Sequence, residues 1–286
     1  MGALAVGLTW WATDGEAAAG RPAPSSPVRH ENTPTSVRTP DSPAPARTEP
    51  SPPPHGRGAR PDGPLTGRVV VIDPGHNPGN VHHTTAINRL VDVGTHHKEC
   101  DTTGTATADG STEAAFTRAL ATELDTRLRQ LGATVVLTHR DGERAFGPCV
   151  DERARIGNRA AADAVVSLHA DGAAAGHRGF HVILPAEVVA GAADTRPITG
   201  PSRELGERIV ARLARVDGSA PSNYVGGGSG LDVRSDLGGL NLSTVPKVFV
   251  EHGNMGDPRD AALLASPAWR AETARALATA LHDFLL

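Results

Sequence analysis

Three short apolar runs in this chain each end on a residue that can bind a metal ion or assist metal chemistry. The runs are residues 72–76, 165–169 and 247–251, and they end on His76, His169 and Glu251. In open α/β sheets, ligands and catalytic groups gather at the carboxyl ends of the strands. We therefore expect these three side chains to meet at one edge of a sheet, in the pattern of a zinc hydrolase.

Strand-like and helix-like segments alternate along residues 65–286, which is typical of the α/β class. Strands are predicted at residues 68–73, 133–138, 164–169, 179–184 and 245–251. Helices are predicted from Ser111, as N-cap, to Leu131, and over residues 151–162, 202–215 and 267–286. Because the strands are mostly continuous apolar runs, both of their faces are expected to be buried. We expect one domain with an open, mostly parallel or mixed sheet that helices cover on both faces.

The first 64 residues differ from the rest in composition. Residues 1–12 are apolar and residues 17–19 are alanines, as in an export signal, but no Lys or Arg precedes the apolar stretch. Residues 21–64 contain thirteen of the 23 prolines and have too few large apolar side chains to fold. We expect a signal-like segment at residues 1–20, a disordered linker at residues 21–64 and a catalytic domain at residues 65–286. A truncated start, an uncleaved anchor or an ordinary cytosolic N-terminus is an alternative for the first segment.

Composition and hydropathy argue against nucleic-acid binding and against a transmembrane span. The net charge is −4, with 28 Lys and Arg against 32 Asp and Glu, and aromatic residues make up 3% of the chain. Nucleic-acid binding usually needs a basic surface and often aromatic rings for stacking, so we expect no nucleic-acid partner. The apolar stretch at residues 1–12 is too short to cross a bilayer and no later run is long enough, so we expect no transmembrane span.

The two cysteines, Cys100 and Cys149, both lie in segments predicted as loops. In a chain with a secretion-like start they can form one disulfide, which would contribute roughly 4 kcal/mol in the loop-entropy model. Two free thiols are the alternative, because geometry decides whether a bridge can close. Neither cysteine belongs to a Cys-x-x-Cys pair, so a zinc-binding role is less well supported.

Two histidines supply only part of a catalytic zinc site, which usually has three protein ligands. A residue between His76 and His169 in the sequence is expected to be the third. Glu113 lies in the first turn of a predicted helix, although the helix dipole alone favours an acidic residue there. The long loop at residues 74–110 contains rival ligands, which are His82, His83, His96, His97 and Glu99. Spacing alone does not rank these candidates.

Four motifs follow one another along the chain: VVVIDPGH at residues 69–76, THRD at 138–141, VVSLHAD at 165–171 and VFVEHGNM at 248–255. In combination they resemble the zinc-dependent N-acetylmuramoyl-L-alanine amidases that cleave peptidoglycan, in the branch typified by the secreted mycobacterial enzyme. The resemblance covers residues 67–286. It implies that His76, Glu113 and His169 bind Zn²⁺ and that Glu251 is the catalytic glutamate.

The same resemblance implies a substrate and a location. The family hydrolyses the amide between N-acetylmuramic acid and the L-alanine of the stem peptide, so the expected partners are peptidoglycan or muropeptide fragments. We expect a monomer that is secreted or lies in the cell envelope. The segments around Cys100 and Cys149 look like the paired-cysteine regions of this branch, which implies a bridge beside the site. The family commonly has a threonine or cysteine where this chain has His252, and a role for His252 in proton transfer stays open.

Arg234 is the expected substrate contact, because it lies in the segment that precedes the last strand and so borders the expected cleft. Its guanidinium can bind a carboxylate of the stem peptide through two hydrogen bonds. A solvated arginine, or a structural ion pair with Asp232 or Asp236, is the alternative.

Two other functions compete with the amidase hypothesis. A catalytically inactive relative, which binds wall fragments or regulates another protein, would usually have lost a metal ligand or Glu251, and all four residues are present. Another zinc peptidase or deacetylase would usually carry a His-Glu-x-x-His helix, and the sequence has none. Both alternatives predict different reaction products from an amidase.

Overall fold

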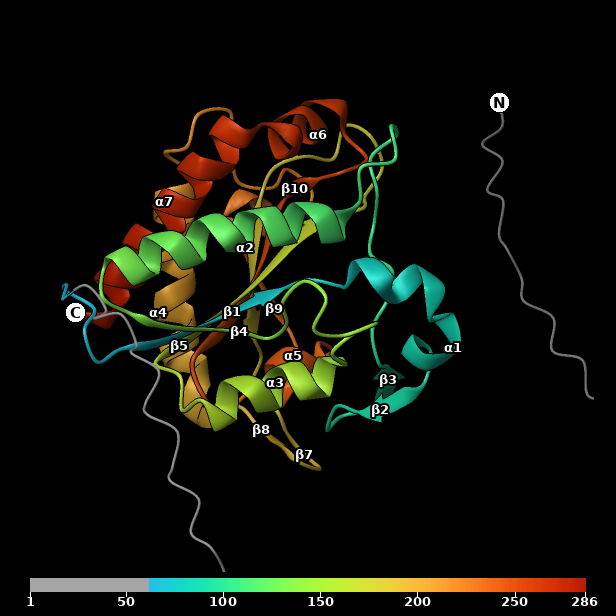
Figure 1. Ribbon diagram of the computed structural model, residues 1–286, viewed down its shortest axis with the longest axis vertical. Coiled ribbons are helices and arrows are strands. Elements are labelled where there is room, and N and C mark those ends of the chain that lie inside the picture. The colour runs from blue at the N-terminus through green and yellow to red at the C-terminus, as the bar shows by residue number, and fades with distance from the viewer. Residues whose placement is uncertain (1–61) are drawn as a thin grey trace, which may run out of the picture. The chain divides into compact units, whose positions relative to one another are not determined.

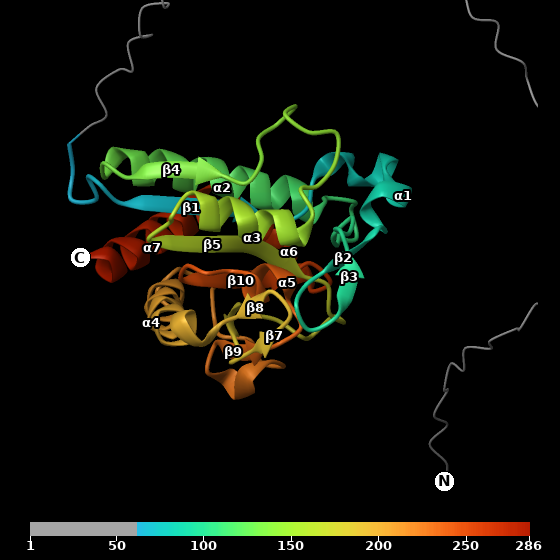
Figure 2. The ribbon, with the colours of Figure 1, turned by 90° about the horizontal axis from the view of Figure 1, so that it is seen from below.

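A mixed six-stranded sheet forms the centre of the computed structural model, which describes residues 62–286 (Figure 1). The strands are β1 (Val69–Pro74), β4 (Thr134–Leu137), β5 (Ala164–Asp171), β6 (His181–Pro185), β9 (Leu231–Arg234) and β10 (Lys247–Asn254). They lie in the order β4-β1-β5-β10-β6-β9, which the labelled strands of Figure 2 follow. The first four are parallel to one another, whereas β6 and β9 run in the opposite direction.

Helices cover both faces of this sheet. One face carries α2 (Glu113–Gln130), α4 (Arg196–Leu213) and α7 (Pro267–Leu285), and the other carries α3 (Val150–Arg159) and α5 (Gly238–Asn241) (Figure 1). Alternate strand residues face the two layers: Val70 and Ile72 belong to the large core under α2, whereas Val71 and Val165 form a smaller core on the opposite face. The expected α/β class, with a mixed sheet covered on both faces, is confirmed.

The helix predicted after Ser111 forms as α2, but its N-cap is Thr112 rather than Ser111. The Thr112 hydroxyl accepts a hydrogen bond from the backbone N–H of Ala115 at 3.3 Å, which satisfies one of the free donors at the start of the helix. Glu113 is therefore the first residue of α2. The leucines at four-residue spacing are fully buried, as the helical pattern predicts.

Two elements differ from the sequence expectations. β9 is a four-residue edge strand with Asp232 and Arg234 in alternate positions, so its pattern is that of a polar loop. α4 begins at Arg196, earlier than the predicted start at residue 202. Pro197 in its first turn, where a missing N–H costs nothing, and Pro201 inside the helix hide this extra length from a propensity argument.

The stretch predicted as one long loop, residues 74–110, contains short elements and a covalent tie. It holds η1 (Pro78–His82), α1 (Thr84–Ile87) and a hairpin of β2 (Leu90–Asp92) and β3 (His97–Glu99). These elements lie beyond the end of β1 (Figure 1). A disulfide joins Cys100 to Cys149, which confirms the bridge and excludes the two free thiols. Because Cys149 is the N-cap of α3, the bridge fastens this stretch to the start of α3.

The described residues begin with Asp62, so the segment expected to be signal-like, residues 1–20, and nearly all of the linker expected at residues 21–64 lie outside them. Among residues 62–286, no helix has the length and apolar character needed to cross a membrane. The remaining short elements are β7 (Val189–Ala190), β8 (Ala193–Asp194), η2 (Gly226–Gly228) and α6 (Pro258–Ala265).

Candidate functional site

The four residues that the family resemblance assigns to metal binding and catalysis, which are His76, Glu113, His169 and Glu251, line one cavity of about 360 Å³. His76 lies two residues after the end of β1, Glu113 is the first residue of α2, His169 lies near the end of β5, and Glu251 lies in β10. His169 and Glu251 are register partners in the parallel pair of β5 and β10, so their side chains are neighbours on one face of the sheet. The expected convergence of these strand ends therefore occurs.

The carboxylate of Glu113 lies between the two imidazoles. Its Oε2 atom is 3.2 Å from Nε2 of His76, and its Oε1 atom is 2.8 Å from Nδ1 of His169. One ligand atom from each of the three residues falls within 4.8 Å of the others, and they form the only such cluster of three His, Cys, Asp or Glu residues in residues 62–286. The rival ligands of the long loop are not part of this cluster.

The electrostatics of this cluster favour a bound positive charge. Burial alone would lower the pKa of His76, but hydrogen bonds to Asp101 and Glu113 outweigh it and raise the pKa to about 10. Burial would raise the pKa of Glu113, yet the two imidazoles hold it far below its usual value. Burial lowers the pKa of His169 and so favours the neutral ring that metals bind. Two imidazoles and one carboxylate are a donor set that suits Zn²⁺.

Two glycines, Gly75 and Gly104, lie against the side chains of the cluster at positions where no Cβ atom would fit. A Cβ atom at Gly104 would lie 2.7 Å from Cδ2 of His76 and 2.9 Å from Oε2 of Glu113, and Gly104 has a φ of +75° that other residues rarely adopt. A Cβ atom at Gly75 would lie 2.4 Å from Nδ1 of His169. The backbones of Gly75 and Gly104 therefore approach the side chains of the cluster more closely than any other residue type allows.

We expect Gly75→Ala to weaken metal binding by about tenfold or more, the range seen when groups that orient metal ligands are lost. The new methyl group would collide with the ring of His169, which is stacked on Phe249 with ring centroids 3.8 Å apart, so the ring can avoid the methyl group only by leaving this stacked position. Competition with a chromogenic chelator measures the effect. Gly200→Ala is the matched control, since a Cβ there meets no atom within 4 Å, and equal weakening in both variants would contradict the steric argument.

Glu251 lines the same cavity as the three clustered residues but takes no part in the close contacts that join them. Its Oε2 atom is buried and has no hydrogen-bond partner among the described residues. Burial, followed by the negative charges of Glu113 and Asp171, raises the pKa of Glu251 well above its usual value. A carboxylate with a raised pKa is suited to accept a proton and then to donate it near neutral pH.

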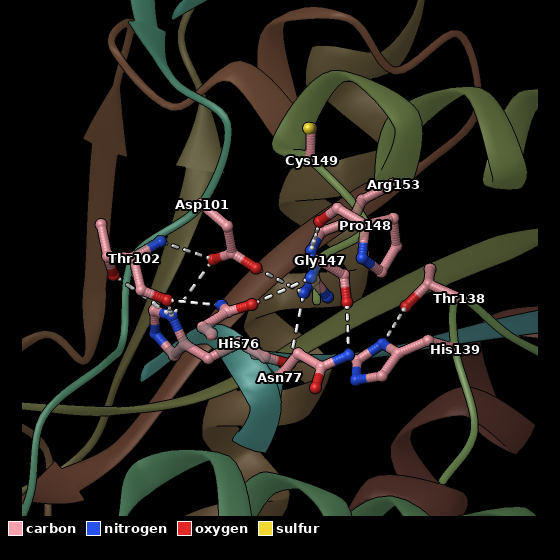
Figure 3. A network of polar contacts seen from close by, with 12 residues as sticks. His76, Asn77, Asp101, Thr102, Thr138, His139, Gly147, Pro148, Cys149 and Arg153 are labelled. Carbon is pink, nitrogen blue, oxygen red and sulfur yellow. Dashed lines mark hydrogen bonds and ion pairs between the residues drawn. The ribbon is translucent and has the colours of Figure 1, made fainter. Parts of the chain in front are cut away.

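Sequence reasoning missed a buried ion network beneath the cluster, of which Figure 3 labels Arg153 and Thr138. Asp73 accepts hydrogen bonds from Arg153 at 2.9 Å, Lys247 at 3.0 Å, Ser167 at 2.9 Å and Thr138 at 2.8 Å. Burial would raise the pKa of Asp73, but the two cations hold it far below its usual value. Lys247 in a predicted apolar strand was the sequence signal that could have indicated this network, because a buried charge needs a partner.

Arg234 lies on β9 and is not among the residues that line the cavity. Its Nε and Nη2 atoms contact the two carboxylate oxygens of Asp236 at 2.8 and 2.5 Å. The structure therefore contains one of the two ion pairs considered as alternatives to substrate binding. Whether the guanidinium also binds a substrate carboxylate stays a prediction.

Comparison with known proteins identifies the family. The family described as N-acetylmuramoyl-L-alanine amidase matches residues 70–283. The N-acetylmuramoyl-L-alanine amidase Rv3717 of Mycobacterium tuberculosis is 40% identical over 222 residues, which are 77% of this chain and 88% of the relative. This chain belongs to the N-acetylmuramoyl-L-alanine amidase family.

Solved structures agree with this assignment. The N-acetylmuramyl-L-alanine amidase Ami1 of Mycobacterium smegmatis has 39% sequence identity and a TM-score of 0.70, with 77% of this chain and 98% of that one covered. AmiC2 of Nostoc punctiforme has 22% identity and a TM-score of 0.56, with 79% and 99% covered, and this likeness concerns the fold alone. The mixed sheet of this amidase-family chain is thus the fold of its relatives.

In this amidase-family chain, His252 faces away from the cavity. It follows Glu251 in β10, so its side chain lies on the opposite face of the sheet, where its ring makes an edge contact with Phe116 of α2 at a centroid distance of 5.8 Å. Its Nδ1 atom is 3.0 Å from the backbone oxygen of His169. Burial lowers the pKa of His252 to about 4. A neutral ring buried on the α2 face packs the core and is poorly placed to transfer protons at Glu251.

Proposed function

We propose that this protein is a zinc-dependent amidase that hydrolyses the bond between N-acetylmuramic acid and L-alanine in peptidoglycan or in muropeptide fragments. The observation that carries the proposal is the cluster of His76, Glu113 and His169, whose ligand atoms lie within 4.8 Å of one another. The chain's membership of the amidase family supplies the substrate class. Glu251 on the neighbouring strand supplies the second carboxylate that amide hydrolysis needs.

In this proposal, His76, Glu113 and His169 hold Zn²⁺, which when bound polarises the amide carbonyl and makes water more acidic. Glu251 accepts the proton of the attacking water as the new carbon–oxygen bond forms. It then gives that proton to the alanine nitrogen as the carbon–nitrogen bond breaks, so the products are a free lactyl carboxylate and a free peptide amine. The side chain of Glu251 lines the same cavity as the three clustered residues, which supports this role.

Arg234 is proposed as a contact for a carboxylate of the stem peptide. Because Asp236 already accepts hydrogen bonds from Nε and Nη2 of the guanidinium, a substrate carboxylate has to replace Asp236 or share the guanidinium with it by binding through Nη1. This exchange of one carboxylate for another favours a modest effect on affinity rather than a dominant one.

The Cys100–Cys149 disulfide supports a location outside the cytosol, since disulfides persist mainly outside this reducing compartment. Together with a peptidoglycan substrate, it supports action in the cell envelope or outside the cell. We assign the catalytic domain to residues 65–286, and we expect it to act as a monomer.

The products of digestion test the proposed function. Purified sacculi and isolated muropeptides are incubated separately with the zinc-loaded protein, and new amino termini and new reducing sugars are quantified. We expect new L-alanine amino termini without new reducing ends, and we expect His76→Ala to lose both bound zinc and this activity. New reducing ends would indicate a glycosidase, and a protein that binds wall fragments without any cleavage would be an inactive relative.

A further inference from the structure

His76 has a backbone conformation that needs external support. Its φ is +60°, in the left-handed region that side chains other than glycine rarely adopt. Arg153 of α3 holds the backbone on both sides of the bend, because its Nη1 atom donates to the carbonyl of Pro74 at 2.6 Å and its Nη2 atom donates to the carbonyl of His76 at 3.3 Å. Figure 3 labels Arg153 and His76. One buried guanidinium therefore fixes the backbone that presents a candidate metal ligand.

The ring of His76 is oriented by oxygen atoms on its far side. Nδ1 lies 3.1 Å from the carbonyl oxygen of Thr102, 3.2 Å from the hydroxyl of Thr102 and 3.3 Å from Oδ1 of Asp101 (Figure 3). A carbonyl and a carboxylate only accept hydrogen bonds, so these contacts place the ring hydrogen on Nδ1. Nε2 faces Oε2 of Glu113, 3.2 Å away, and is the ring nitrogen that would give up its hydrogen to a bound metal.

Asp101 is itself held rigidly. It is 5% exposed, and its Oδ2 atom accepts a hydrogen bond from Nη2 of Arg153 at 3.0 Å. Arg153 thus contacts both the backbone of His76 and the carboxylate that faces the ring of His76. A carboxylate behind a metal-binding histidine fixes the tautomer and the ring orientation, and its loss typically costs ten- to a hundredfold in metal affinity.

The disulfide keeps Asp101 within reach of α3. Cys100, the residue before Asp101, is joined to Cys149, the N-cap of the helix that carries Arg153. The backbone N–H of Val150 donates to the carbonyl of Cys100 at 2.7 Å. The bridge therefore fastens the loop of Asp101 to the start of the helix, one turn before Arg153.

We propose that Asp101 is a positioning residue that selects Nε2 of His76 as the metal-binding atom, and that the Cys100–Cys149 bridge makes this arrangement sensitive to thiol oxidation. The proposal rests on the metal-binding half of the proposed function and not on its substrate. Reduction of the bridge removes the covalent tie between the loop of Asp101 and α3 and leaves only the hydrogen bonds of Val150 and Arg153 to hold the loop there. The oxidised protein is then the form with high metal affinity.

Zinc affinity of the full chain, measured by competition with a chromogenic chelator, tests the role of Asp101. We expect Asp101→Ala to weaken binding by about ten- to a hundredfold, and Asp101→Asn to weaken it less because its amide oxygen still accepts from Nδ1. The control is Asp163→Ala, which removes an aspartate that pairs with Arg68 at 3.2 Å and accepts from the N–H of Val69 at the other end of β1. That variant should leave zinc affinity unchanged.

A spectroscopic readout separates positioning from general loss of stability. Nitrogen-15 NMR of the zinc-loaded protein should show a hydrogen on Nδ1 of His76 and the metal on Nε2, and Asp101→Ala should give a mixture of the two arrangements. Zinc affinity within twofold of the unaltered protein in Asp101→Ala would overturn the role of Asp101, and Asp101→Asn gives the answer if the alanine variant does not fold. Failure of the unaltered chain to bind zinc would instead overturn the proposed function.

A separate experiment tests whether the Cys100–Cys149 bridge affects zinc affinity. We expect the paired replacement Cys100→Ala and Cys149→Ala to weaken zinc binding by about tenfold, and we expect Asp101→Ala to add little in that background, because both changes remove one shared arrangement. Reduction of the unaltered protein with a phosphine, which does not compete as a thiol ligand, should reproduce the effect. Unchanged zinc affinity in the cysteine variant would overturn the proposed effect of the bridge and leave the role of Asp101 standing.

Discussion

Glu251→Gln is expected to lower amide hydrolysis by about 10²- to 10⁴-fold while zinc binding stays within a fewfold of the unaltered protein. The lost factor is the usual contribution of a general acid–base group, since the glutamine amide has the shape of the carboxylate but accepts no proton from water. The metal cluster is unaffected because its close contacts join His76, Glu113 and His169 without Glu251. Single-turnover rates and metal content of the same preparation provide the measurement.

The control for this variant is Glu99→Gln. Glu99 lines the same cavity as Glu251 but is exposed at the end of β3, so the substitution removes a cavity carboxylate without removing the buried one. We expect its rate to stay within a fewfold of the unaltered protein. Full turnover in Glu251→Gln would remove the general-base assignment, and equal losses in both variants would mean that overall cavity charge matters rather than one proton acceptor.

The sequence allowed the strand ends to be predicted because buried parallel strands carry an unmistakable apolar signal. The runs before His76, His169 and Glu251 all became central strands, and their ends meet as the rule for open sheets requires. Local signals also placed α2, whose apolar spacing matches the helical period. These predictions needed no knowledge of distant contacts.

Other features depended on contacts that spacing does not encode. Asp101 and Arg153 are 52 residues apart, and Arg153 and His76 are 77 apart, so no local pattern joins them. Glu113 could be preferred to the loop histidines as the expected third ligand only by resemblance, because the choice depends on where α2 and the loop lie in space. β9 was missed for a different reason, which is local: a short polar edge strand has almost no apolar pattern from which a strand could be predicted.

Lys247→Met is expected to lower the free energy of unfolding by about 3 to 5 kcal/mol, the usual cost of removing one partner from a buried ion pair. Lys247 is 1% exposed, and its ammonium group lies 3.0 Å from Oδ2 of Asp73. Without Lys247, Arg153 is the only cation paired with Asp73 within the described residues. Arg153 also forms an ion pair with Asp101. For a chain of this size the loss corresponds to a fall in Tm of about 6 to 20 °C, measurable by calorimetry and denaturant unfolding.

Lys98→Met is the natural control, since Lys98 is the only other lysine in the chain and is only half-buried on β3. We expect it to change stability by less than about 0.5 kcal/mol. The variant Lys247→Met with Asp73→Asn should lose less than the sum of the two single changes, because the second substitution removes the carboxylate that the first leaves poorly paired. Equal losses in the Lys247 and Lys98 variants would mean that Arg153 alone neutralises Asp73.

The pH dependence of Lys247→Met follows from the depressed pKa of Asp73. A carboxyl group whose pKa is lower in the folded protein than in the unfolded chain stabilises the fold above its unfolded pKa of about 3.9, and this stabilisation is lost as the pH falls. Lys247 and Arg153 supply the depression in the unaltered protein. The variant retains only part of it and has less to lose in acid. The stability gap between the two proteins should therefore be full near neutral pH and should narrow below about pH 4, whereas a gap independent of pH would point to lost packing of the lysine stem instead.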